Sequence, residues 1–78
     1  MTLNEFIMLS EDGQWATVYS MGKSLDIVIE GNSKYVLYAI DKFFVEVEWN
    51  IETEEIVDKR VFKLGDTLDR YSNVPKEI

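Results

Sequence analysis

Residues 35–50 read Tyr35-Val-Leu-Tyr-Ala-Ile-Asp-Lys-Phe-Phe-Val-Glu-Val-Glu-Trp-Asn50 and predict two consecutive strands. The second half alternates apolar and mostly polar residues, a pattern typical of a strand with one face on a core and one toward water. Its apolar set is Phe43, Val45, Val47 and Trp49. The first half, from Tyr35 to Ile40, is apolar on both faces. That strand therefore requires cover on its second face as well.

Two short turns set the register of three strands. A turn at Asp41-Lys42 pairs Ile40 with Phe43, Tyr38 with Val45 and Val36 with Val47, and a turn at Gly31-Asn32 pairs Ile27 with Val36 and Leu25 with Tyr38. Directly opposed residues share a face, and a slip of one residue would invert the pattern. The predicted core face comprises Leu25, Ile27, Ile29, Val36, Tyr38, Ile40, Phe43, Val45, Val47 and Trp49.

The outer face of the same strands is also apolar at its centre. Its predicted binding residues are Val28, Tyr35, Leu37, Ala39 and Phe44, with a rim of Asp26, Glu30, Glu46 and Glu48. A patch of this kind usually has a purpose on a soluble monomer. Two explanations stay open: the C-terminal residues Leu68, Tyr71 and Val74 fold over it, or a partner or second copy does. Glutamates 46 and 48 inside the core would contradict the register.

The flanking residues complete an α+β fold. Thr2-Leu-Asn-Glu5 has the form of a capping box and predicts a short helix over residues 3–9, with Leu3, Phe6 and Ile7 facing the sheet. Further strands are expected over Trp15–Tyr19, Leu25–Glu30 and Ile56–Leu64, and Asp66 is the expected N-cap of a short C-terminal helix. The predicted fold is a short N-terminal helix, about five antiparallel strands in a meander, and a short C-terminal helix.

The last strand admits two registers. One opposes Glu46 and Lys59 but turns Asp58 and Arg60 toward the core side, and the other opposes Glu46 and Asp58. We favour the first, because like charges opposed on a sheet are unfavourable. The mixed polarity of this strand suits the edge of a sheet.

Composition limits the class of protein. A chain of 78 residues with 46% hydrophobic residues predicts one folded domain over residues 1–78. Its net charge of −7 is spread along the sequence and disfavours nucleic-acid backbones. The longest apolar run is too short for a membrane span, and the first residues lack the pattern of a signal peptide. We therefore expect a cytoplasmic protein that binds neither nucleic acid nor membrane.

The chain has few of the residue types that catalysis or metal binding usually requires. The chain has no histidine and no cysteine, so cysteine-based metal sites are excluded and the usual nucleophile–base pairs are missing; a carboxylate, Lys or Tyr could act as a base only with a strong pKa shift. Glu52, Glu54 and Glu55 crowd one turn, but a calcium loop normally alternates Asp or Asn ligands around a glycine. We interpret them as a solvated turn. The expectation is a protein with no enzymatic activity, no catalytic residues, no metal and no cofactor.

Three segments carry a resemblance. They are Leu37-Tyr-Ala-Ile-Asp-Lys-Phe-Phe-Val-Glu-Val-Glu-Trp49, Ile56-Val-Asp-Lys-Arg-Val-Phe62 and Leu68-Asp-Arg-Tyr71, and together they are similar to short uncharacterised proteins of Bacteroides-type bacteria. The resemblance implies an antiparallel meander ending in a short helix, and it implies no activity.

The sequence thus favours a small non-catalytic protein-interaction module that uses an apolar sheet face, binding a protein partner or a second copy. An acidic inhibitor or immunity-type protein that masks a basic surface is the alternative, and a small-ligand carrier or enzyme is disfavoured by the thin reactive inventory. Salt separates the first two, because electrostatic masking weakens steeply with ionic strength.

Overall fold

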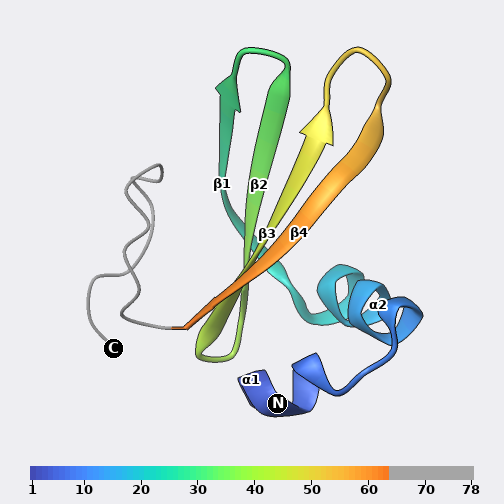
Figure 1. The fold of residues 1–78 in the computed structure, drawn as a ribbon. Helices are drawn as coiled ribbons and strands as arrows, with labels where there is room; N and C mark the ends of the chain where they lie inside the picture. Colours follow the sequence, from blue (N-terminus) through green and yellow to red (C-terminus); the bar gives the residue numbers. More distant parts are fainter. Residues whose placement is uncertain (64–78) are drawn as a thin grey trace.

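A computed structural model describes residues 1–63 as two helices followed by a four-stranded sheet (Figure 1). The helices are α1 (Leu3–Ile7) and α2 (Glu11–Met21), and the strands are β1 (Lys23–Glu30), β2 (Ser33–Ile40), β3 (Phe43–Asn50) and β4 (Glu55–Lys63). The strands form an antiparallel meander in the order β1-β2-β3-β4. The α+β class and the antiparallel sheet are confirmed. The sheet has four strands within these residues, and the predicted C-terminal helix lies outside them.

Helix α1 begins as the sequence predicts. The Glu5 amide donates to Thr2 Oγ1 at 3.1 Å, and the Thr2 amide donates to Glu5 Oε1 at 2.7 Å. These two bonds satisfy backbone donors that the first turn of a helix leaves unpaired. Phe6 is buried against the sheet, Leu3 packs beside it, and Ile7 is exposed. The expected contact of Ile7 with the sheet is therefore wrong.

The predicted strand over Trp15–Tyr19 is also wrong, because these residues lie in α2. Ser10 caps this helix through a 3.1 Å bond from the Gly13 amide. A spacing of four puts Trp15 and Tyr19 on one side of a strand and also on one side of a helix. Their rings stack in α2 with centroids 5.9 Å apart. The alternation was too short to separate the two periods.

The two central hairpins have the predicted turns. Ile40 pairs with Phe43, Tyr38 with Val45 and Val36 with Val47, as expected. The β1–β2 turn places Gly31 at φ 61°, a conformation that glycine adopts without strain. The pairing of Ile27 with Val36 is confirmed.

The predicted pairing of Leu25 with Tyr38 is wrong. A β-bulge between Ser24 and Asp26 inserts one extra residue in β1, so Ser24 takes the place opposite Tyr38. Leu25 packs on the outer-face cluster instead of the core face.

The main core lies between the sheet and the two helices, on what we call the helix face. Its buried residues are Phe6, Val18, Ile40, Phe43, Val45 and Val47. Tyr38, Trp49 and Val61 pack against this cluster. The prediction is confirmed for β3, where Phe43, Val45 and Val47 are buried and Trp49 is partly buried. It is wrong for Ile27 and Ile29, which are 57% and 62% exposed. Both helices pack near the β2–β3 turn and leave the other end of this face uncovered (Figure 1).

Strand β4 takes neither of the two predicted registers. A shift between Glu48 and Trp49 brings Glu46 opposite Arg60 and Glu48 opposite Asp58. Lys59, opposite Val47, therefore points to the helix face. The like-charge pair of Glu48 and Asp58 is tolerated because the Arg60 guanidinium bonds to both carboxylates. Within residues 1–63, β4 is an edge strand, as its mixed polarity indicates.

Candidate functional site

The outer-face residues singled out from the sequence form one cluster in the structure. Leu37 and Phe44 are its buried centre, with Leu37 0% exposed. Val28, Tyr35 and Ala39 are partly buried around them, together with Leu25 and Phe62. All five predicted residues are thus brought together. The centre of the cluster is buried, and the predicted cover by Leu68, Tyr71 and Val74 lies outside the described residues.

A charged network borders that cluster on the outer face. Arg60 donates to Glu46 Oε1 and Glu48 Oε1 at 2.8 Å each, and it lies 3.1 Å from Asp58 Oδ2. The Ser33 hydroxyl donates to the second oxygen of Glu48 at 3.0 Å. These bonds, above all those from Arg60, lower the pKa of the Glu48 carboxyl below its usual value.

Glu46 is buried, with 1% of its surface exposed, and is not the solvated rim residue that the sequence predicts. It nevertheless lies on the outer face, opposite Arg60 and beside Leu37, so the hairpin register stands. Across the described residues, every buried side-chain nitrogen and oxygen has a hydrogen-bond partner. The network therefore consists of mutually satisfied charges, which stabilise one register of β4.

The surface that is open to a partner lies on the helix face, beyond α2. One cross-strand row runs through all four strands there and consists of Ile29, Lys34, Trp49 and Ile56. Ile27 stands beside this row on β1, and Ile51 follows β3 in the next turn. We call these six residues the open surface. Four of them are isoleucines that are each at least 40% exposed.

A groove runs along one side of this surface. It has a volume of about 440 Å³ and is lined by Ile29, Lys34, Trp49, Asn50, Ile51 and Glu54. The Ile51 amide donates to the Asn32 carbonyl at 2.8 Å and so ties the two turns at this end together. Asn50 Oδ1 accepts from the Glu52 and Thr53 amides and holds the β3–β4 turn closed. The groove is therefore built on hydrogen-bonded backbone.

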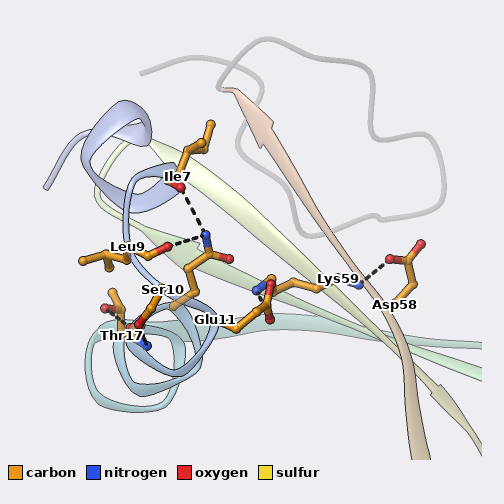
Figure 2. A network of polar contacts seen from close by, with 9 residues as sticks. Ile7, Leu9, Ser10, Glu11, Thr17, Asp58 and Lys59 are labelled. Atoms are coloured by element: carbon orange, nitrogen blue, oxygen red, sulfur yellow. Dashed lines mark hydrogen bonds and ion pairs between the residues drawn. The ribbon is translucent and has the colours of Figure 1, made fainter.

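A second, smaller groove of about 260 Å³ continues toward α2 and is lined by Glu11, Trp15, Ile56, Val57, Asp58 and Lys59. Figure 2 shows Lys59 reaching from β4 to Glu11 at the start of α2, where Nζ and Oε2 are 3.1 Å apart. Lys59 Nζ also lies 4.8 Å from the centre of the Trp15 ring. Lys34 has a similar position over Trp49, at 5.7 Å. Both lysines of this region are thus engaged with the protein itself.

The charge around the open surface is negative. Glu52, Glu54 and Glu55 occupy the β3–β4 turn and the first position of β4, and Glu11 and Asp12 begin α2. No ion pair within residues 1–63 involves Glu52, Glu54 or Glu55. In the same part of the chain, no group of three or more acidic side chains is arranged to hold a metal ion. The acidic rim is therefore a source of electrostatic attraction for positively charged groups.

Sequence reasoning missed the open surface. It assigned Ile27, Ile29 and Trp49 to the core correctly by face, but it had no measure of how far the helices extend over that face. The available signal was Ser10, followed by Glu11 and Asp12, which is the usual start of a helix. A helix over these residues removes one strand from the predicted sheet. It also means that one short helix has to cover the wide helix face, so part of that face stays open.

Comparisons with known proteins add no assignment: no family model, curated protein or solved structure matches the chain. Neither helix within residues 1–63 has the length and apolar character that crossing a membrane requires.

Proposed function

We propose that the protein is a small non-catalytic interaction module that binds a partner protein on the open surface. The observation that carries the proposal is the row Ile29–Lys34–Trp49–Ile56, whose isoleucines are exposed beside a groove of about 440 Å³. Exposed apolar side chains gathered at one place, with a polar rim, characterise protein-binding surfaces. Trp49 is the kind of partly buried aromatic residue that anchors such interfaces.

This proposal keeps the class of function that the sequence favours and moves it to another surface. The outer-face residues Leu37 and Phe44 are enclosed, so a partner would first have to uncover them. Ile27 and Ile29 need no rearrangement. Docking on a surface that already exists avoids the free-energy cost of opening a packed cluster.

The non-catalytic part of the proposal rests on chemistry. The chain has no histidine or cysteine, and the carboxylates brought together on the outer face are held by Arg60. A general base near neutral pH would need a carboxylate with a raised pKa, whereas the Glu48 pKa is lowered.

The test uses a matched pair of double variants. Ile29→Ser/Ile56→Ser removes two apolar side chains from the open surface, and Ile7→Ser/Met8→Ser removes two exposed ones beside α1. Proteins from a cell extract that bind the wild-type chain are identified by mass spectrometry, purified and titrated by calorimetry against all three chains. We expect the open-surface variant to bind at least about ten-fold more weakly, equal to ~1.4 kcal/mol, and the control to bind like wild type. Equal affinities for all three, or no protein that prefers wild type to the open-surface variant, would contradict the proposal.

A further inference from the structure

The helix face of the sheet carries an incomplete layer of helices. Helix α2 starts beside Lys59 on β4, and the glycine that follows it, Gly22, lies against Tyr38 on β2. It therefore crosses the strands rather than running along them. Strand β3 has eight residues, so it is roughly 26 Å long at a rise of about 3.3 Å per residue. A helix with its side chains is only about 10–12 Å wide. Both helices lie toward the end of the face near the β2–β3 turn (Figure 1), and the exposed side chains of Ile29 and Ile56 mark the part beyond α2 that they leave uncovered.

The row that such a helix would cover has a matching length. Four strands at a spacing of about 4.8 Å place Ile29 and Ile56 roughly 14 Å apart. Between two and three turns of helix span that distance at about 5.4 Å per turn. The exposed side chains of Ile29 and Ile56 and the partly buried ring of Trp49 would meet an apolar stripe on the helix, in the way that Val18 of α2 meets the sheet.

The acidic side chains around the open surface indicate which charge such a helix would carry. Glu54 lines the larger groove and Glu52 lies in the same turn, whereas Glu11 lines the smaller groove at the start of α2. The two lysines nearby, Lys34 and Lys59, are already engaged with Trp49, with Trp15 and with Glu11. Basic side chains flanking an apolar stripe would thus meet complementary charge at the β3–β4 turn, because Glu52 and Glu54 take part in no ion pair within residues 1–63.

From these observations we infer that the occupant of the open surface is an amphipathic helix of another protein, apolar on one face and rich in lysine or arginine along its flanks. This inference rests on the proposed function and specifies its partner. A second copy of this chain fits less well. A symmetric dimer would set the same acidic surface against itself, and each copy carries a net charge of −7.

The probe is a synthetic amphipathic helix of about 15 residues made of leucine and lysine, a length at which isolated helices begin to form. Two matched peptides serve as controls: one with glutamate in place of lysine, and one of identical composition whose order destroys the apolar face. Each is titrated by calorimetry into the wild-type chain at two salt concentrations. We expect the leucine–lysine peptide to bind at least about ten-fold more tightly than either control, and more weakly at high salt.

Two charge variants then locate the binding. Glu52→Gln/Glu54→Gln removes two charges of the acidic rim, and Glu5→Gln/Asp41→Asn removes two at the other end of the molecule with the same change in net charge. We expect a loss of affinity of at least about three-fold for the rim variant alone, and Ile29→Ser/Ile56→Ser to weaken binding as well. Equal losses in both charge variants would show that net charge, not this surface, attracts the peptide, and would overturn the inference.

Two other outcomes separate this inference from the proposed function. Equal binding of the leucine–glutamate peptide would refute the basic partner and leave apolar docking on the open surface intact. Sedimentation of the wild-type chain tests self-association in parallel. A wild-type dimer that dissociates in Ile29→Ser/Ile56→Ser would show that a second copy is the occupant, and would overturn the inference in favour of a homodimer.

Discussion

Replacing Val47 by alanine tests whether the helix face is buried near α2 and open beyond it. Val47 is 1% exposed and lies in the core cluster with Val18 of α2. Ile27 lies on the same cross-strand row, two strands away, and is mostly exposed. Replacement by alanine at each of the two positions therefore compares a covered and an uncovered part of one face. Both variants lose the strand propensity of a β-branched residue, so that term largely cancels.

The expected magnitudes follow from burial. Val47→Ala removes two buried carbon atoms, and at ~0.8 kcal/mol for each this lowers the free energy of unfolding by about 1.6 kcal/mol. Incomplete collapse of the surrounding core raises the loss to roughly 2–3 kcal/mol. Ile27→Ala removes side-chain atoms that are largely in water already, and we expect a loss below about 1 kcal/mol. A chain of this size has a total stability of roughly 4–12 kcal/mol, so the Val47 change is a substantial part of it.

The assay is reversible urea unfolding followed by circular dichroism, with thermal unfolding as a second readout. A loss of about 2 kcal/mol lowers the midpoint temperature by roughly 8–16 °C in a domain of this length. The slope of the urea transition must stay unchanged for the comparison to hold. Equal losses at the two positions, or a larger loss at Ile27, would refute the division of the helix face into a covered and an open part.

Two further predictions concern α2 and the charged network. Ser10→Ala should lower the free energy of unfolding by about 1 kcal/mol, because the Gly13 amide loses its acceptor. Ser20→Ala, at the other end of α2, is the control and should have little effect. Chemical denaturation measures the free energy of unfolding of both variants. The lowered pKa of Glu48 contributes stability that is present above the unfolded-state pKa of about 4.3 and is lost as the pH falls through the folded-state pKa. Stability should therefore fall from about pH 5 downward, and the slope attributable to Glu48 should shrink in Arg60→Met; an unchanged acid dependence in that variant would contradict the role of Arg60.

Much of the sheet could be predicted because hairpin register is a local property. The turn at Asp41-Lys42 and the alternation of β3 specify the pairing of Val36 with Val47 without any information from the rest of the chain. The capping box of Thr2 and Glu5 is local for the same reason. Each depends on residues that are close in sequence, and their chemistry is readable from the residue types alone.

The failures arise where the deciding contact is distant or where two periods coincide. Trp15 and Tyr19 share a side in a helix and in a strand, so only the Ser10 cap and the packing of Val18 separate the alternatives. The register of β4 depends on Arg60 bonding to Glu46 and Glu48 of another strand. Arg60 also offsets the repulsion between Glu48 and Asp58. Taken alone, this like-charge pair argues against the observed register.

The sequence by itself determined the antiparallel hairpins, their turns, the start of α1 and the absence of histidine and cysteine chemistry, because each of these depends on neighbouring residues or on composition. It also determined which residues share a face. Only the tertiary structure decided which part of each face is covered. Glu46 is buried because Arg60 and the outer-face cluster enclose it, and Ile27 and Ile29 stay exposed because α2 crosses the sheet nearer its other end. Burial is a property of elements packed across long sequence separations, and the alternation of a strand carries no information about how far its cover extends.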